Sequence, residues 1–316
     1  MNEFALIERI RRRAAVDDDS GILIGIGDDA AVLQVAPGRA LVASTDSLLP
    51  GRHFLVESTP ADIGHLAAAV NLSDLAAMGA RPRWALLALT LPEGDSHWLD
   101  GFLDGFLGLC AVHDTRLVGG NLSAGPLNIG VQLLGDIDPG RIARRGQAQA
   151  GDVLLVTGSL GDAAAALTLA ESASAELLAR LRRPTPRVEA GQLLAGLATA
   201  MIDVSDGLLA DLGHLLGQSA GARIAVEKLP CSAALAASAI DPPRRWQLQL
   251  NGGSDYELLL SLPATAVDTA ISACAELGVP LSPIGQVDAS GRIECRLADG
   301  KRLEIADAGW DHFQSR

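Results

Sequence analysis

The chain has 316 residues and a formal net charge of −13, and both values limit what it can be. The length allows one large domain, or two domains that each have a hydrophobic core, and we expect two. So large a negative charge argues against a nucleic-acid backbone or an anionic membrane as the main partner. A phosphate substrate would also be repelled, unless metal ions or an arginine cluster reverse the local field.

Cysteine, lysine and apolar patterns exclude further kinds of site. The four cysteines are far apart and form no Cys-x-x-Cys pair, so neither a disulfide framework nor a zinc site is expected. The two lysines, Lys228 and Lys301, lie outside glycine-rich loops, which excludes a Walker-type phosphate loop. The longest apolar run, residues 84–91, is far too short to span a bilayer, and the N-terminus carries no apolar signal core. We therefore expect a soluble, cytoplasmic protein.

The first half of the chain mixes predicted helices and strands, which indicates an α+β domain. Helical spacing of apolar residues predicts an amphipathic helix over residues 3–15. A threonine cap followed by proline predicts a second helix from residue 60 to about 78, and a third is expected over 96–113. Strands are predicted at 22–26, 30–35, 40–44, 84–91, 116–118 and 127–134, with a tight turn at 119–121.

Composition changes over residues 141–152, and this change predicts a boundary between domains 1–148 and 149–316. Arg144 and Arg145 in this segment can be a phosphate clamp or a solvated linker, and the sequence does not decide between them. The second half has the alternation of an α/β domain, and its glycine-rich turn at 157–162 is interpreted as structural. Strands are expected at 153–156, 201–204, 256–262, 283–287 and 292–297, and helices after 162, at 186–200, after a cap at Ser205 and at 266–277.

Four short segments place aspartate beside small or hydroxyl-bearing residues. They are Gly27-Asp28-Asp29-Ala30-Ala31, Ser44-Thr45-Asp46, Asn71-Leu72-Ser73-Asp74 and Asp203-Val204-Ser205-Asp206. Each segment alone can be structural, because Asp, Ser and Asn are also preferred at helix caps and turns. If the fold brings the four together, they supply hard oxygen ligands, which suit Mg²⁺ or Ca²⁺ rather than zinc or copper. Asn71 and Asp74 are expected on one helix face, and Asp203 and Asp206 at a helix N-terminus that keeps them ionised.

These segments occur in one order with three further motifs. The further motifs are residues 71–80 in full, Gly252-Gly253-Ser254-Asp255-Tyr256-Glu257-Leu258 and Trp310-Asp311-His312-Phe313. Together they resemble the thiamine-monophosphate kinases, of the superfamily that includes aminoimidazole ribonucleotide synthetase and selenophosphate synthetase. The resemblance implies a two-domain α/β fold, a homodimer in which N-terminal domains share a β-barrel, and Mg²⁺-dependent, in-line phosphoryl transfer from ATP to thiamine monophosphate.

The resemblance also implies roles for individual residues. The implied Mg²⁺ ligands are Asp29, Ser44, Thr45, Asp46, Asp74, Asp203 and Asp206, with Asn121 as a weaker ligand. The implied ATP contacts are Gly120, Asn121, Arg145 and Ser205. The implied contacts to thiamine monophosphate are His53, Ser254 and Trp310. We expect no general base, because the acceptor phosphate is already a nucleophilic oxyanion and phosphoryl transfer depends on alignment and charge neutralisation. Trp310 offers a ring face to the cationic thiazolium.

Three residues depart from the family pattern. The family commonly has Asp-Thr-Thr-Arg after Gly119-Gly120, and here Asn121 replaces the aspartate and Ala124 the arginine. Ser254 replaces a glutamate on the predicted substrate side. Two alternatives therefore stay open: a related ATP-dependent enzyme that acts on another acceptor, and a nucleotide-binding dimer that has lost turnover.

Overall fold

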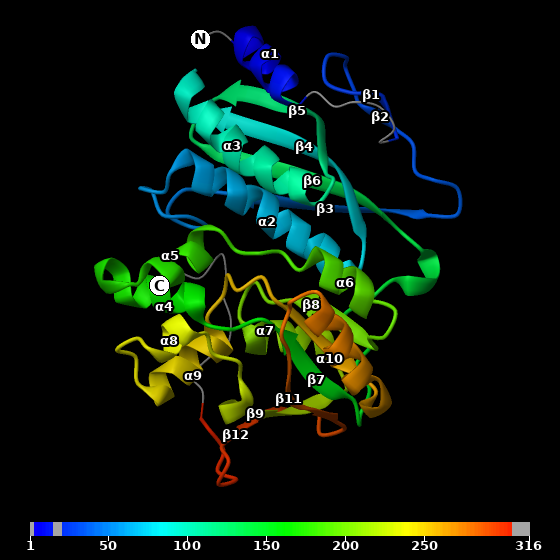
Figure 1. Cartoon of the computed structure of the whole chain (residues 1–316), viewed down its shortest axis with the longest axis vertical. Coiled ribbons are helices and arrows are strands. Elements are labelled where there is room, and N and C mark those ends of the chain that lie inside the picture. The colour runs from blue at the N-terminus through cyan, green and yellow to red at the C-terminus, as the bar shows by residue number, and fades with distance from the viewer. Residues whose placement is uncertain (1–2, 15–20, 305–316) are drawn as a thin grey trace. The chain divides into compact units, whose positions relative to one another are not determined.

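The structure is a computed structural model, and it describes residues 3–14 and 21–304. The chain forms two compact units. The first holds the described part of Met1–Leu75 together with Ala80–Gly140, and the second holds Ala76–Gly79 and the described part of Arg141–Arg316. Each unit is built on its own β-sheet (Figure 1).

A four-stranded sheet organises the first unit. Its order is β3 (Ala40–Leu48), β6 (Asn128–Ile137), β4 (Arg81–Leu91) and β5 (Arg116–Ala124). The pairs β3–β6 and β6–β4 are antiparallel, whereas β4 and β5 are parallel and joined through helix α3 (Ser96–Val112). Among the described residues this sheet is open, with β3 and β5 at its edges, and the single chain contains no closed barrel. The shared barrel of a dimer stays a prediction.

Helices α2 (Pro60–Met78) and α3 cover one face of this sheet (Figure 1). The two helix backbones come into contact where they cross, because each helix has a glycine there that faces the backbone of the other helix. A Cβ on Gly64 would lie 2.0 Å from the Phe102 carbonyl oxygen, and one on Gly105 would lie 1.9 Å from the Ala61 carbonyl oxygen. Helix α2 is apolar on nearly every side, which suits a helix buried this closely.

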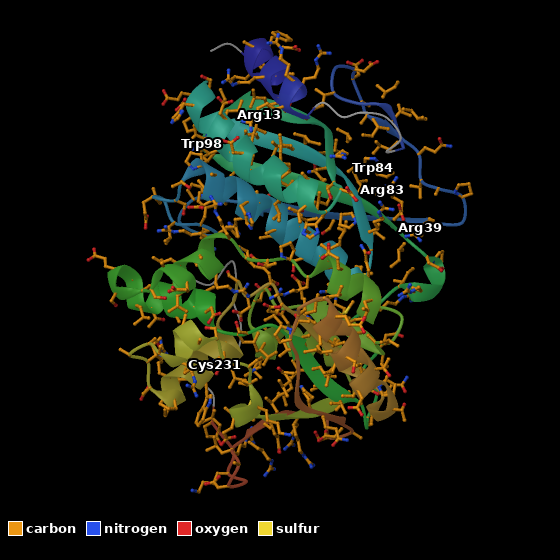
Figure 2. All side chains as sticks on the ribbon, in the orientation of Figure 1. Arg13, Arg39, Arg83, Trp84, Trp98 and Cys231 are labelled. Atoms are coloured by element: carbon orange, nitrogen blue, oxygen red, sulfur yellow. The ribbon has the colours of Figure 1, made fainter. Side chains whose placement is uncertain are left out.

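Aromatic rings and arginines complete the first unit. The ring of Trp98 stacks on Phe102 with centroids 5.4 Å apart, and Arg83 lies over the ring of buried Trp84 at 5.6 Å (Figure 2). Two short strands, β1 (Ile22–Ile24) and β2 (Val32–Leu33), form a separate antiparallel pair. Trp84, Phe102 and Phe106 are thus buried between the helices and the sheet.

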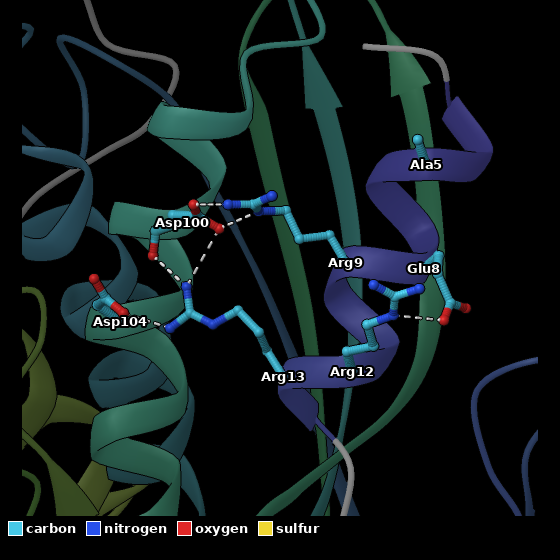
Figure 3. Close-up of a pocket in the computed structure, with 7 residues that line it drawn as sticks. All are labelled: Ala5, Glu8, Arg9, Arg12, Arg13, Asp100 and Asp104. Carbon is cyan, nitrogen blue, oxygen red and sulfur yellow. Dashed lines mark hydrogen bonds and ion pairs between the residues drawn. The ribbon is translucent and has the colours of Figure 1, made fainter.

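Helix α1 (Glu3–Ala14) is attached to α3 by ion pairs (Figure 3). Arg9 binds the carboxylate of Asp100, and Arg13 binds that of Asp104. These residues line an open hollow of about 660 Å³. Its positive charges face carboxylates in the same hollow, so we interpret it as a brace between two helices and not as an anion site.

A six-stranded sheet organises the second unit. Its order is β12 (Ile293–Arg296), β9 (Gly221–Ala225), β11 (Leu281–Asp288), β7 (Val153–Thr157), β10 (Leu258–Leu262) and β8 (Ala200–Asp203). All neighbours are antiparallel except β12 and β9. The α-helices are α4 (Asp162–Leu169), α5 (Ala175–Arg182), α6 (Val188–Leu194), α7 (Leu208–Leu216), α8 (Ala233–Ala236), α9 (Pro242–Asn251) and α10 (Val267–Glu276). Short 3-10 turns occur at Pro139–Arg141, Ala170–Ser172, Val226–Lys228 and Ala264–Ala266.

Two aliphatic cores stabilise the second unit. The larger one packs the leucine stripe of α7 against the sheet, and the smaller one joins α4, α5, α8 and α9 through residues such as Leu177, Leu235 and Leu248. Every residue of β8 and β10 is buried, because both faces of these strands are covered. Their sequences are accordingly mostly apolar, with Asp203 and Ser261 as the polar residues, and do not alternate.

Several predicted elements in the first unit differ from the structure. Strand β3 extends to Leu48, so Ser44-Thr45-Asp46 lies within the strand and not at its end. The predicted turn at residues 119–121 is wrong, because β5 continues through it to Ala124. Gly120 has φ of +149°, and a Cβ there would lie 1.9 Å from the Leu87 carbonyl oxygen, so the glycine permits a close approach of two strands. Residues 30–35 contribute only the two-residue β2.

In the second unit the longer predicted elements are present with changed limits. The helix expected at 186–200 spans only Val188–Leu194, and β10 begins at Leu258 rather than at 256. The cap assigned to Ser205 is wrong, because the N-cap of α7 is Gly207. Sequence patterns did not predict α5, α8, α9 or β9. No helix in residues 3–14 and 21–304 is long and apolar enough to cross a membrane.

Candidate active-site residues

Two loops of the second unit lie side by side through backbone hydrogen bonds. The first loop, residues 204–207, follows β8, and the second, residues 252–257, precedes β10. The Ser254 amide donates to the Ser205 carbonyl oxygen at 2.8 Å, and the Tyr256 amide donates to the Val204 carbonyl oxygen at 2.8 Å. These bonds bring together two motifs that the sequence places about 50 residues apart, and with them the predicted ATP and substrate residues Ser205 and Ser254.

The segment that carries Arg145 runs past the first of these loops. The Met201 amide of β8 donates to the Arg144 carbonyl oxygen at 3.2 Å, and the Gly146 amide donates to the Leu215 carbonyl oxygen of α7 at 3.0 Å. Arg145 itself is exposed. Its backbone is thus fixed between the strand and the helix that border Asp203 and Asp206, while its guanidinium stays accessible.

Asp211 is a residue that the sequence reasoning missed. It lies in the first turn of α7, is 2% exposed, and its Oδ2 accepts hydrogen bonds from the amides of Ser205 and Asp206, both at 3.1 Å. Burial, together with the nearby charge of Asp206, raises the pKa of Asp211 to about 7, although hydrogen bonds from backbone amides act in the opposite direction. The signal available in the sequence was a single aspartate within a leucine stripe.

The Glu257 cluster, defined as Thr157, Arg180, Arg187 and Glu257, lies at the start of β10. Arg187 donates to both carboxylate oxygens of Glu257, from Nε at 2.6 Å and Nη2 at 2.7 Å. Arg180 adds a bond at 2.7 Å, and so does the hydroxyl of Thr157. Glu257 is fully buried, and two cations compensate its charge. Its main chain also holds the first loop, because the Val204 amide donates to the Glu257 carbonyl oxygen at 2.8 Å.

Asp255 is a second buried carboxylate in the same loop, without a cation bound to it directly. Its Oδ1 accepts from the Gly161 amide at 2.9 Å, and within the described part of the chain its Oδ2 has no hydrogen-bond partner. Burial raises the pKa of Asp255 well above its usual value. The residues on either side, Ser254 and Tyr256, have φ of +66° and +51°, a left-handed conformation that non-glycine residues rarely adopt.

In the first unit the structure joins two of the predicted ligands. The Ser44 hydroxyl of β3 donates to the Asp74 carboxylate of α2. Asp46 lies on the same face of β3 as Ser44, since side chains two apart in a strand share a face. The Thr45 side chain lies on the other face, where its hydroxyl donates to the Val131 carbonyl oxygen at 3.1 Å.

The other predicted residues of the first unit lie on turns and strands. Asp29 is exposed in the β1–β2 connection, and His53 accepts a hydrogen bond from the Leu49 amide on its Nδ1 at 2.9 Å. Asn121 is exposed on β5. Asn71 is fully buried, its amide donates to the Ala67 carbonyl oxygen, and its Oδ1 has no partner among the described residues.

Comparisons with known proteins agree with this arrangement. Residues 27–137 match the family model "AIR synthase related protein, N-terminal domain", and residues 149–298 match the corresponding C-terminal domain. The thiamine-monophosphate kinase of Escherichia coli K12 is 41% identical over 98% of this chain and 98% of its own. The chain belongs to the thiamine-monophosphate kinase family.

Two solved structures of this family superpose on nearly the whole chain. The thiamine-monophosphate kinase of Stenotrophomonas maltophilia K279a has a TM-score of 0.86 and 42% identity, and the match covers 96% of this chain and 98% of that one. AaThiL, solved in complex with AMPPCP and TMP, has a TM-score of 0.76 and 31% identity, over 98% of this chain and 97% of that one. The fold of the family is therefore present in both units.

The structure brings some of the family-implied residues together and leaves others apart. Ser44, Asp46 and Asp74 form one group in the first unit, and Arg145, Asp203, Ser205, Asp206 and Ser254 border the paired loops of the second. In the parts of the chain that the structure describes, no three His, Cys, Asp or Glu side chains form a preorganised metal site. Trp310 lies outside the described residues.

Proposed function

We propose that this chain transfers the γ-phosphoryl group of ATP to the phosphate of thiamine monophosphate, which yields thiamine diphosphate and ADP. The supporting observation is that a relative matching 98% of the chain was solved with AMPPCP and TMP together. AMPPCP has the shape and charge of ATP but resists cleavage. A protein of this family can therefore hold a nucleoside triphosphate and the acceptor at the same time.

Mg²⁺ fits the side chains that we propose as its ligands. They are carboxylate, hydroxyl and amide oxygens, the hard donors that Mg²⁺ prefers. The proposed ligands are Asp29, Ser44, Asp46, Asp74, Asn121, Asp203 and Asp206. Thr45, which the family resemblance also implies, is left out because its hydroxyl lies on the other face of β3 and donates to the Val131 carbonyl oxygen. The hydrogen bond between Ser44 and Asp74 supports the grouping, because it holds two such oxygens side by side. When bound, Mg²⁺ neutralises phosphate charge, which a chain of net charge −13 otherwise repels.

The chain's own groups then bind and orient the two substrates. Nucleotide contacts are proposed at Gly120, Asn121, Arg145 and Ser205, and contacts to thiamine monophosphate at His53, Ser254 and Trp310. Phosphoryl transfer needs the acceptor oxygen in line with the bond that breaks, so orientation supplies much of the rate. The bond between the Ser254 amide and Ser205 supports this division, because it fixes one proposed acceptor contact against one proposed nucleotide contact.

The two domains are proposed to have different roles in substrate binding and in assembly. We assign nucleotide and Mg²⁺ binding and dimerisation mainly to residues 1–148, and we propose a cytoplasmic homodimer. The open β3 edge of the first sheet supports pairing, because an unpaired strand edge offers backbone donors and acceptors to a second chain. Gel filtration with light scattering tests this assembly, and a monomer at working concentration would contradict it.

A coupled assay of ADP release tests the activity. Mg-ATP is supplied with and without thiamine monophosphate, and the product is identified by mass. We expect thiamine diphosphate to appear in step with ADP. If nucleotide binds but no thiamine diphosphate forms, the proposal is wrong, and the departures at Asn121, Ala124 and Ser254 become the place to look for another acceptor or for lost turnover.

A further inference from the structure

We propose that Asp211 is a positioning residue, whose buried carboxylate fixes the Ser205–Asp206 peptide and so sets the direction of the side chains that contact nucleotide and metal. This inference rests on the proposed function, since it concerns residues assigned there to ATP and Mg²⁺. Asp211 itself contacts neither substrate nor metal in this proposal. It acts through the backbone of the loop at residues 204–207.

The peptide between Ser205 and Asp206 is held from both sides. Its carbonyl oxygen accepts a hydrogen bond from the Ser254 amide at 2.8 Å, and its N–H donates to Oδ2 of Asp211 at 3.1 Å. The preceding N–H, that of Ser205, donates to the same carboxylate oxygen at 3.1 Å. A peptide plane bonded at both its oxygen and its nitrogen cannot turn without breaking one bond, so the Cα–Cβ directions of both residues are fixed.

The location of Asp211 makes this bonding necessary. It is 2% exposed on the same stripe of α7 as Leu208, Leu212 and Leu215, which pack into the larger core. A carboxylate in such surroundings destabilises the fold unless hydrogen-bond donors compensate it. The donors here are amides of the loop, so the cost of burying the carboxylate is recovered only when the loop has this conformation.

The same bonds determine what the start of α7 can bind. Amides before the first turn of a helix often bind phosphate directly. Here the amides of Ser205 and Asp206 are occupied by Asp211, so this loop offers side chains to a nucleotide rather than its amide groups. That arrangement agrees with phosphate held by arginine and metal ions, and it assigns Asp211 a role separate from metal binding.

The test compares Asp211→Leu and Asp211→Asn with Asp152→Asn. Leucine removes both acceptor oxygens at similar volume, whereas asparagine keeps one neutral acceptor. Asp152 is a matched control, because it is also buried in the second unit and its Oδ2 accepts from a loop amide, that of Gln149 at 3.1 Å. Affinity for Mg-AMPPCP is measured by calorimetry, kcat and KM by the coupled assay, and folding by circular dichroism and thermal unfolding.

We expect Asp211→Leu to weaken Mg-AMPPCP binding and lower kcat/KM by about 10- to 100-fold, the range found when groups supporting a ligand are removed. Asp211→Asn should be intermediate, and Asp152→Asn should lower the unfolding midpoint with unchanged nucleotide affinity. A folded Asp211→Leu with wild-type affinity and kcat/KM overturns the inference. If that variant does not fold, Asp211→Asn decides the matter, and a parallel loss in Asp152→Asn would show a merely structural role.

The two proposals fail in different ways. If the wild-type protein binds Mg-AMPPCP but forms no thiamine diphosphate, the proposed function fails, and the role of Asp211 is still judged from the affinities of the variants. If the wild-type protein binds no nucleotide, the inference about Asp211 is overturned as well, because the loop then has no nucleotide to receive.

Discussion

The two units differ in the exposure of the carboxylates at their proposed sites. In the first unit Asp29 is exposed and Asp74 is half-buried, and both are accessible to a ligand. In the second unit Asp211 in α7 and Asp255 and Glu257 in the second loop are all buried. The first unit thus presents carboxylates to what it binds, whereas the second also uses carboxylates to hold the backbone that presents its side chains.

The buried carboxylates also differ in how their charge is compensated. Glu257 faces two arginines, whereas Asp211 has two backbone amides and Asp255 has one. Burial raises the pKa of Asp211 and that of Asp255, because neither has a cation bound to it directly. Asp211 and Asp255 thus lack the cations that contact Glu257, and substitutions at these three positions should have graded effects.

The largest effect is expected from Glu257→Gln. The amide keeps the shape of the side chain but removes the negative partner of half-buried Arg187 and leaves Arg180 with only its longer ion pair to Asp162 at 3.8 Å. Breaking a buried pair in this way costs about 3–5 kcal/mol of unfolding free energy. Urea denaturation measures the loss. The same substitution at Glu294, which pairs with Arg296 at the surface, is the control and should leave the midpoint unchanged. Equal midpoints for the two variants would contradict the compensation argument.

Asp74→Asn should affect activity rather than stability. Asparagine can still accept the hydrogen bond from Ser44, but it removes a charge that we propose faces Mg²⁺ and phosphate. We expect kcat/KM to fall about 100-fold or more, with the unfolding free energy within about 0.5 kcal/mol of wild type. Asp62→Asn in the first turn of the same helix is the control. Wild-type turnover in Asp74→Asn would remove this residue from the proposed metal ligands.

Asp255→Asn should change how stability depends on pH. The pKa of Asp255 is raised in the folded state, so the folded protein binds a proton that the unfolded chain releases near pH 4. The contribution of protonated Asp255 to the unfolding free energy is therefore complete below that pH, and it is lost as the pH rises toward the pKa of Asp255 in the folded state. The Asn variant should show a flatter decline in unfolding midpoint over this interval. Identical pH profiles for both proteins would show that Asp255 is ionised when folded.

The smallest effect is expected from Glu8→Gln on the exposed helix α1. Hydrogen bonds from Arg11 and Arg12 lower the pKa of Glu8, but these groups lie at the surface where water and salt screen them. A slight decrease in thermal midpoint at low salt should disappear at about 0.5 M salt, where the screening length is only a few ångströms. A decrease that persists at high salt would show that the brace to α3 depends on Glu8.

The sequence predicted helices and strands well where the residues of a single segment determine its conformation. Helices α2 and α3 and strands β7 and β11 follow from apolar runs and caps within single segments. Prediction failed where a distant backbone decides the conformation. Gly119 and Gly120 are typical of a turn, yet β5 continues through them because the neighbouring strand approaches Gly120 too closely for a side chain.

The candidate site residues also divide into those that the sequence predicted and those that it did not. The acidic motifs and their order identified the family and an oxygen-rich ligand set, because the chemistry of phosphate and Mg²⁺ restricts which side chains are useful. The residues that support Glu257 could not be found, because their contacts join distant parts of the chain. Arg180 and Thr157 reach Glu257 across 77 and 100 residues of sequence.

The sequence by itself therefore determined the kind of chemistry, the family and the order of most elements, since these depend on residue type and local spacing. Tertiary structure alone decided which carboxylates are held by arginines, which by amides and which remain accessible. Burial and hydrogen bonding set the charge and orientation of an acid, and both are properties of its neighbours in space. Asp211 and Asp74 are the same residue type in helices, and only the fold separates the buried support from the proposed ligand.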